Sequence, residues 1–231
     1  MIGSEAHFET LPVRLSAVTK VYGASRDGVP AVDDVSFEVS TGEMVALTGP
    51  SGCGKSTLLA LVGCVDRPTS GVVTIEGQAT TTLSDSAMTL LRRTRVGTVF
   101  QFFNLLPTMT VAENIGVPLV LQGHGRFEIL DRVSAALEAV GLERKARSYP
   151  DELSGGEAQR VAIARATIHG PAVVLADEPT GNLDSRNAMQ VMQLFRELAF
   201  GGQSILLASH SNAAASLCDR VICMQDGRVE R

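Results

Sequence analysis

Tryptophan is absent from this chain of 231 residues, and aromatic side chains make up only 4% of it. The longest apolar run, LLALVGCV at 58–65, is far shorter than the roughly 20 residues that a membrane-spanning helix needs, so we expect no such helix. The first residues carry acidic side chains and no apolar block of the kind that a secretory signal contains. The sequence therefore predicts a cytoplasmic protein.

Basic residues are also few. Lysine and arginine together number 20, against 25 aspartates and glutamates, and the net charge of −5 gives no reason to expect a nucleic acid partner. The four cysteines, Cys53, Cys64, Cys218 and Cys223, form no C-x-x-C pair, which favours reduced thiols. At this length the chain can fold as one large domain with a substantial core.

Short apolar runs alternate with helical patterns along most of the chain. Strands are predicted at 11–18, 31–39, 43–49, 71–77 and 96–100, and later at 172–177, 204–209 and 220–229, with a buried helix at 55–64. Strands that alternate with helices are typical of a parallel sheet covered on both faces. We therefore expect one α/β domain over 1–231, with a core at 1–101 and 156–231.

The pattern between 102 and 155 is helical and predicts an inserted subdomain. Its second helix, at 126–141, repeats apolar residues every three or four positions, which predicts one buried face made of Phe127, Leu130, Val133, Leu137 and Val140. The stretch 102–120 is unusually apolar for a connection. Two interpretations of this stretch stay open: contact with a partner protein, and burial within the subdomain.

The stretch GPSGCGKST at 49–57 fits the pattern G-x-x-x-x-G-K-[ST] and lies between an apolar strand and a helix, as a phosphate-binding loop requires. Backbone N–H groups would wrap the phosphates, Lys55 would reach the β and γ positions, and the Ser56 hydroxyl could ligate Mg²⁺. A chance loop is the alternative. The expected nucleotide ligands are Gly49, Ser51, Gly52, Cys53, Gly54, Lys55, Ser56 and Thr57.

A second group of polar residues follows the ends of predicted strands. Asp177 and Glu178 end the run VVLADEP, where Asp177 can hold Mg²⁺ and Glu178 can deprotonate a water that attacks the γ-phosphate. His210 follows SILLAS, and Gln101 follows VGTVF, where its amide could reach Mg²⁺ or the same water. For each residue the alternative is a solvated turn, a helix cap or a polar loop side chain.

Ser154, Gly155 and Gly156 open another predicted helix, and free N–H groups at a helix start can also hold an anion. The chain thus has two phosphate-binding devices but one set of candidate catalytic groups. A plain helix cap is the alternative for this second device.

Together these motifs resemble the ATP-binding subunits of ABC transporters over almost the whole chain. GPSGCGKST resembles the Walker A loop, Gln101 the Q-loop, LSGGEAQ the signature, VVLADEP Walker B, NLDS with Asp184 the D-loop, and His210 the switch histidine. Tyr22 stands where this family places an aromatic residue on adenine, with plain packing as the alternative. The resemblance implies a P-loop ABC ATPase fold with an N-terminal antiparallel β subdomain and an inserted α-helical subdomain, and ATP and Mg²⁺ as cofactors.

The resemblance also implies a homodimer. In this family Ser154, Gly155, Gly156 and Glu157 of one subunit would close over the ATP that the other subunit holds. The finer motifs are similar to the group that serves macrolide exporters and lipoprotein-release systems. That likeness implies a separate FtsX-type permease and a place on the inner face of the cell membrane.

Two other functions stay open from the sequence. One is a regulator that uses ATP-driven dimerisation to control a membrane or cell-wall complex without transport. The other is a soluble ABC protein that acts on ribosomes or DNA, which ranks last because the chain has no tandem ATPase domains, long coiled coil or basic face.

Overall fold

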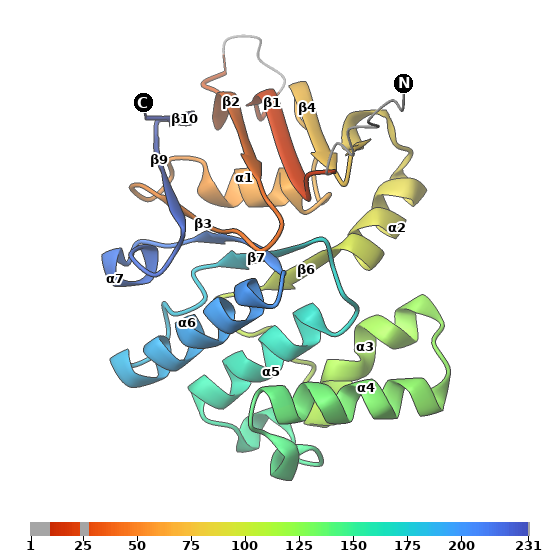
Figure 1. Cartoon of the computed structure of the whole chain (residues 1–231). Coiled ribbons are helices and arrows are strands. Elements are labelled where there is room, and N and C mark those ends of the chain that lie inside the picture. Colours follow the sequence, from red (N-terminus) through yellow and green to blue (C-terminus); the bar gives the residue numbers. More distant parts are fainter. Residues whose placement is uncertain (1–9, 24–27, 231) are drawn as a thin grey trace, which may run out of the picture.

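Two β-sheets with helices between and below them organise the computed structural model, which describes residues 10–23 and 28–230 (Figure 1). Residues 1–9 lie outside that range. They begin the N-terminal stretch in which the sequence predicts no export signal. The strands are β1 (Val13–Lys20), β2 (Val32–Val39), β3 (Met44–Thr48), β4 (Ser70–Ile75), β5 (Gln78–Ala79), β6 (Val96–Val99), β7 (Val173–Asp177), β8 (Ser204–Ala208), β9 (Arg220–Gln225) and β10 (Arg228–Val229). The α-helices are α1 (Lys55–Val62), α2 (Asp85–Arg95), α3 (Val111–Gln122), α4 (Arg126–Ala139), α5 (Gly155–Thr167), α6 (Ser185–Phe200) and α7 (Asn212–Ala215).

The larger sheet has the strand order β10-β9-β3-β8-β7-β6, and every pair from β9 to β6 is parallel. Successive side chains of a strand point to opposite faces, so both faces of a covered sheet must be apolar. Strand β3 shows this: Met44 and Ala46 face the core beside α5 and α6, while Val45 and Leu47 face the core beside α1. The predicted sheet with two covered faces is confirmed.

The smaller sheet is antiparallel, with the order β2-β1-β4-β5. Helix α1 lies between the two sheets, and its Leu58 and Leu61 join one core with Val13 of β1 and Val73 of β4 (Figure 1). The predicted N-terminal antiparallel β subdomain is therefore confirmed.

Helices α3 and α4 pack beside α5 on the other face of the larger sheet (Figure 1). Ile115 of α3 and Leu137 of α4 are buried in the same core as Met44 of β3, so the helical region shares its interior with the sheet. No helix in 10–23 or 28–230 combines the length and the apolar character that a bilayer crossing requires.

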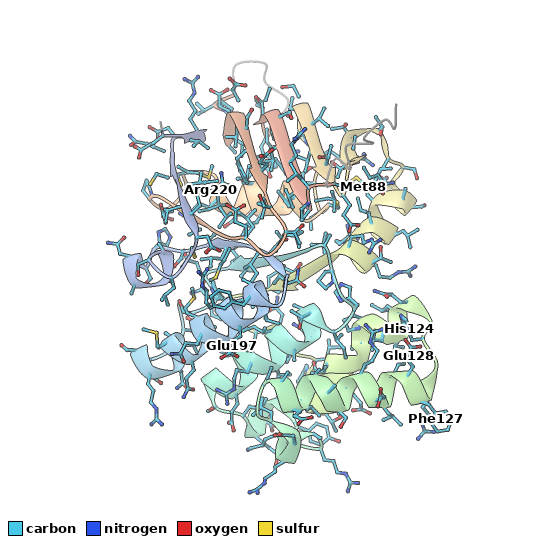
Figure 2. The ribbon with its side chains drawn as sticks, viewed as in Figure 1. Met88, His124, Phe127, Glu128, Glu197 and Arg220 are labelled. Atoms are coloured by element: carbon cyan, nitrogen blue, oxygen red, sulfur yellow. The ribbon has the colours of Figure 1, made fainter. Side chains whose placement is uncertain are left out.

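The predicted apolar face of the second inserted helix is correct only in part. Val133, Leu137 and Val140 are buried, but Phe127 is 88% exposed and points away from the protein at the start of α4 (Figure 2). Leu130 is also exposed. Ile129, in the first turn of α4, packs against the core with Val133 and Leu137, so the buried side of the helix is the one that carries these three residues. Phe127 and Leu130 lie off that side, and next to Phe127 the Glu128 carboxylate pairs with His124 at 2.8 Å (Figure 2).

Two other elements differ from the prediction. Helix α2 lies in a region for which the sequence predicts mainly strands. Ser84 caps this helix by accepting a hydrogen bond from the Ala87 N–H, and Met88 and Leu91 are its only buried residues. The predicted last strand, 220–229, is a hairpin of β9 and β10 instead. Asp226 and Gly227 have φ values of 48° and 80°, which suit a tight two-residue turn.

Candidate nucleotide site

The carboxyl ends of four neighbouring strands bring the predicted site residues together. Strands β3, β8, β7 and β6 are adjacent and parallel, so the residues that follow them meet at one edge of the sheet. A cavity of about 250 Å³ lies there. It is lined by Ala31, Ser51, Gly52, Gly54, Lys55, Ser56, Thr57, Gln101, Asp177, Glu178 and His210.

The loop between β3 and α1 needs its glycines for conformation and for space. Gly49 has a φ of 138°, and a Cβ on it would lie 2.1 Å from the Met224 carbonyl oxygen. Gly54 has a φ of 107°, and a Cβ there would lie 2.2 Å from the Ala31 carbonyl oxygen. L-residues with side chains avoid such φ values, so the loop path requires glycine at both positions.

Lys55 is buried, and its ammonium group donates to the carbonyl oxygens of Gly49 at 2.7 Å and Pro50 at 3.0 Å. Its charge is therefore held at the cavity wall by the loop itself. Cys53 does not line the cavity: its side chain is buried in the core beside α1, with Sγ 3.7 Å from Lys55 Nζ. Gly49 does not line the cavity either, and its role is to allow the path of the loop.

Glu178 and His210 form a pair inside the cavity. One Glu178 oxygen, Oε2, accepts from the His210 backbone N–H at 3.3 Å, and the other, Oε1, lies 3.2 Å from His210 Nε2. Within the described residues Oε1 is buried and has no aligned hydrogen-bond donor. Glu178 also has a φ of 48°, which is uncommon for a residue with a side chain and typical of strain at functional turns.

Three oxygen donors border the same cavity: the Ser56 hydroxyl, the Gln101 amide and the Asp177 carboxylate. Hard oxygen ligands of this kind suit Mg²⁺, which uses few protein carboxylates when phosphate oxygens complete its shell. No cluster of three or more His, Cys, Asp or Glu residues with metal spacing occurs in the described ranges. The donor set therefore fits a magnesium ion shared with a nucleotide and does not fit a metal site built by protein alone.

The second phosphate device lies outside this cavity. Ser154 is the N-cap of α5, and it forms a capping box in which Glu157 Oε2 accepts from the Ser154 N–H and hydroxyl, both at 2.8 Å. These bonds hold the pKa of Glu157 below its ordinary value. Gly155 is exposed, while Gly156 is buried where a Cβ would lie 2.2 Å from Asn187 Oδ1. The capping interpretation is thus correct for the local structure, and Ser154, Gly155 and Gly156 do not line the cavity of their own chain.

Two other predicted residues also lie outside the cavity. Tyr22 is 54% exposed, and the ammonium group of Lys20 lies 4.9 Å from its ring centre. Asp184 is the N-cap of α6 and accepts from the backbone N–H groups of Arg186 and Asn187, both at 3.0 Å. The backbone and side-chain amides of Asn187 lower the pKa of Asp184.

Sequence reasoning gave no individual role to several residues that support this site. The Ala31 carbonyl lies against the loop, and Asn182 contacts Gln101 through two hydrogen bonds, at 3.0 and 3.4 Å. Gln159 and Arg165, both on α5, donate to carbonyl oxygens near Gln101. Gln159 closes the stretch LSGGEAQ that resembles the signature, whereas no pattern in the sequence points to the contacts of Arg165.

A comparison with known protein families gives one match, a model described as "ABC transporter", over residues 32–181. The chain belongs to the ABC transporter family. It is an ATP-binding subunit of this family and an ABC ATPase, and the resemblance seen in its motifs is confirmed.

Relatives of known sequence agree. The ABC transporter ATP-binding protein MJ0796 of Methanocaldococcus jannaschii is 41% identical over 224 residues, which cover 95% of either chain. The macrolide export ATP-binding/permease protein MacB 1 of Yersinia pestis is 39% identical over 217 residues. That match covers 94% of this ABC ATPase but only 33% of the MacB protein.

A solved structure extends the likeness to three dimensions. It is described as a dimeric, post-hydrolysis state of the ATP-binding cassette MJ0796 bound to ADP and Pi. It is 40% identical in sequence, has a TM-score of 0.85, and covers 95% of this chain and 97% of its own. The fold of an ABC ATPase with an antiparallel β subdomain is thereby confirmed.

Proposed function

We propose that this ABC ATPase acts as a homodimer that encloses two ATP molecules and drives a separate FtsX-type permease in the cell membrane. The observation that carries the proposal is the separation of two phosphate devices within one chain. The cavity holds the loop at 49–57 with Gln101, Asp177, Glu178 and His210, whereas Ser154 and Gly155 are exposed elsewhere. A second copy placed head to tail would bring the start of its α5 to this cavity, and MJ0796 forms a dimer.

Within each site we assign the chemistry by position. Lys55 and the loop N–H groups hold the phosphates. Glu178 lines the cavity, where its carboxylate can accept a proton from the attacking water, and His210, with Nε2 3.2 Å from Glu178 Oε1, orients that carboxylate. Ser56, Gln101 and Asp177 would hold Mg²⁺, which supplies charge neutralisation at the phosphates when bound. The same assignment makes Tyr22 an adenine contact and Ser154, Gly155, Gly156, Glu157 and Asp184 contacts across the dimer.

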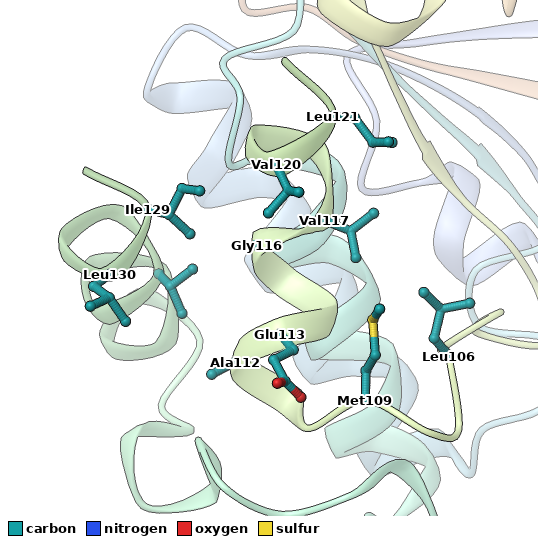
Figure 3. Close-up of a pocket in the computed structure, with 11 residues that line it drawn as sticks. Leu106, Met109, Ala112, Glu113, Gly116, Val117, Val120, Leu121, Ile129 and Leu130 are labelled. Atoms are coloured by element: carbon teal, nitrogen blue, oxygen red, sulfur yellow. The ribbon is translucent and has the colours of Figure 1, made fainter. Parts of the chain in front are cut away.

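An apolar groove on the helical region supports the proposal of a protein partner. It lies between α3 and α4, has a volume of about 370 Å³, and is bordered by Leu106, Met109, Val120, Ile129 and Leu130 (Figure 3). Much of it comes from the apolar stretch 102–120, and Val120 is 61% exposed. We infer that the permease binds here, which would hold the ATPase on the inner face of the membrane.

The likeness to MacB points to the type of permease. The name of that protein joins ATP binding to a permease in one chain, and this ABC ATPase matches one part of it. We infer that the partner supplies the equivalent of the permease part as a separate polypeptide. No nucleic acid partner is proposed.

The experiment is to purify a tagged Glu178→Gln variant from native membranes in the presence of Mg-ATP and to identify what accompanies it. Gln keeps the shape of the side chain but is a poor proton acceptor, so hydrolysis should fall by at least about 100-fold while ATP binding persists. We expect a polytopic permease and two ATPase chains in each assembly. Val120→Asp should reduce recovery of the permease, whereas Val65→Asp, at another exposed valine, should not.

Three results would contradict the proposal. Retained hydrolysis in Glu178→Gln would remove Glu178 as the base. Recovery of a permease with one ATPase chain would contradict the homodimer. Soluble partners alone would favour the non-transport regulator or the soluble ABC protein.

A further inference from the structure

The loop that carries Gln101 contains a turn that the backbone alone disfavours. Phe103 and Asn104 have φ values of 60° and 49°, so two consecutive residues with side chains occupy the left-handed region. Such conformations cost roughly 1–3 kcal/mol each and persist only where surrounding structure imposes them. The turn has two short-range backbone bonds, from Phe103 N to Phe100 O at 3.3 Å and from Asn104 N to Phe102 O at 2.6 Å. Further support must come from other parts of the protein.

Arg165 supplies part of that support from α5. Its guanidinium donates to the carbonyl oxygens of both left-handed residues, at 2.8 Å to Phe103 and 2.7 Å to Asn104. Arg165 is half-buried, which lowers its pKa, and it makes no ion pair within the described residues. Because a half-buried cation needs compensation, these two charge-assisted bonds fix the turn and the guanidinium together.

Gln159, six residues earlier on the same helix, supports the other side of Gln101. It is fully buried, and its amide nitrogen donates to the Pro179 carbonyl at 2.7 Å and lies 3.5 Å from the Phe100 carbonyl. Phe100 precedes Gln101, and Pro179 follows Glu178. One side chain therefore connects the two loops that carry proposed catalytic groups.

Both side chains belong to the helix that begins at the second phosphate device. The ring of Phe103 also lies close to this end, since a Cβ on Gly155 would be 3.7 Å from Phe103 Cζ. Helix α5 thus contacts the Gln101 loop at its start through Gly155, and along its length through Gln159 and Arg165.

We infer that Arg165 and Gln159 are positioning residues that fix the position of the Gln101 amide. Through them, the conformation of this loop depends on the position of the α5 end at Ser154. The inference rests on the proposed role of Gln101 as a ligand of the metal that accompanies ATP. Neither side chain contacts the nucleotide cavity; each acts through the loop that Gln101 occupies.

The test measures metal binding directly, with Mn²⁺ as the probe. In the Glu178→Gln background with saturating ATP, free Mn²⁺ is titrated by electron paramagnetic resonance for Arg165→Lys, Gln159→Met and Gln101→Ala. Lysine keeps the charge but lacks the planar fork in which two separate nitrogens each donate to one carbonyl, and methionine keeps the volume but not the donors. We expect each variant to raise the half-saturating Mn²⁺ concentration by about tenfold, the usual effect of removing support from a metal ligand. Arg160→Lys is the matched control, because Arg160 lies on the same helix and bonds only to Gln190 at the surface.

Steady-state kinetics in the otherwise native protein add a second readout. Arg165→Lys and Gln159→Met should raise the Mg²⁺ concentration for half-maximal hydrolysis and leave the KM for ATP at saturating Mg²⁺ within about twofold of the parent value. Thermal unfolding is measured in parallel. A lower melting temperature with unchanged metal dependence would assign a purely structural role and overturn the inference.

Failure of the inference and failure of the proposed function are distinguishable. If Gln101→Ala weakens Mn²⁺ binding but both α5 variants do not, the inference is overturned and the role of Gln101 stands. If Gln101→Ala leaves Mn²⁺ binding unchanged, the proposed role of Gln101 is overturned, and the inference with it. If one α5 variant fails to fold, the other decides the result.

Discussion

Replacement of Asn114 by leucine should destabilise the connection between the Gln101 loop and the helical region. Asn114 lies on α3 and is fully buried. Its side chain accepts from the Leu106 N–H at 2.7 Å and donates to the carbonyl oxygens of Leu106, Met109 and Thr110 at 3.1, 3.0 and 3.0 Å. The amide thus shapes the segment between the Gln101 loop and the start of α3.

The cost follows from the groups that would lose their partners. The Leu106 carbonyl keeps a bond from the Met109 N–H, and the Thr110 carbonyl keeps one from the Asn114 N–H. The Leu106 N–H and the Met109 carbonyl are left without a protein partner. Each unpaired buried group costs about 1–3 kcal/mol. Leu106 and Met109 are partly exposed, so water can relieve part of this, and we expect a loss of about 2–4 kcal/mol in the free energy of unfolding.

Urea unfolding followed by circular dichroism measures this loss. Gln122→Leu is the control, because the Gln122 side-chain amide makes two bonds outside the core, to the Arg93 carbonyl at 2.8 Å and to His124 Nε2 at 3.3 Å, and should cost less than about 1 kcal/mol. A loss below about 1 kcal/mol for Asn114→Leu with an unchanged m-value would refute the reasoning, since the loop would then not depend on this side chain.

Two further predictions concern the two phosphate devices. Gly49→Ala should abolish ATP binding measured by calorimetry, because its Cβ would clash with the Met224 carbonyl. Gly52→Ala has a φ of 80° but open space around it, so it should cost only about 1–2 kcal/mol of stability. Equal effects of the two replacements on ATP binding would contradict the steric argument. Because the folded-state pKa of Glu157 is lowered, its contribution to stability is present above the unfolded pKa of roughly 4.3 and is lost as pH falls through the folded value. Glu157→Gln should therefore unfold with a weaker dependence on pH than the parent protein below about pH 5, and parallel curves of unfolding free energy against pH would count against the capping box as the cause.

The parts of the site that were predictable are those in which chemistry and local structure share one short stretch. The loop at 49–57 places its glycines, lysine and hydroxyl within nine residues, and its flanking strand and helix follow from the same pattern. Asp177, Glu178, Gln101 and His210 were predictable for a related reason: each follows an apolar strand, and parallel strands bring their carboxyl ends to one edge.

Contacts between distant positions were not predictable. Gln159 and Phe100 are 59 residues apart, and Arg165 and Phe103 are 62 apart, so no periodicity connects them. The predicted apolar face of α4 shows the same limit. Several apolar residues can be read as one side of a helix, but the spacing does not tell which of them meet the partner: Ile129 packs against the core with Val133, whereas Phe127 lies on another side and is exposed.

Three of the eight described non-glycine residues with left-handed backbone angles lie near the nucleotide cavity of this ABC ATPase. Glu178, Phe103 and Asn104 all have left-handed backbone angles, and all lie in loops that border the nucleotide cavity or lead from it. Such residues need external contacts, and here α5 provides them through Arg165 to the first loop and Gln159 to both. Since the same helix begins at Ser154, any force on that end from a partner subunit would act on the loops that hold Gln101 and Glu178. The strain in these turns would then make the site sensitive to the placement of α5.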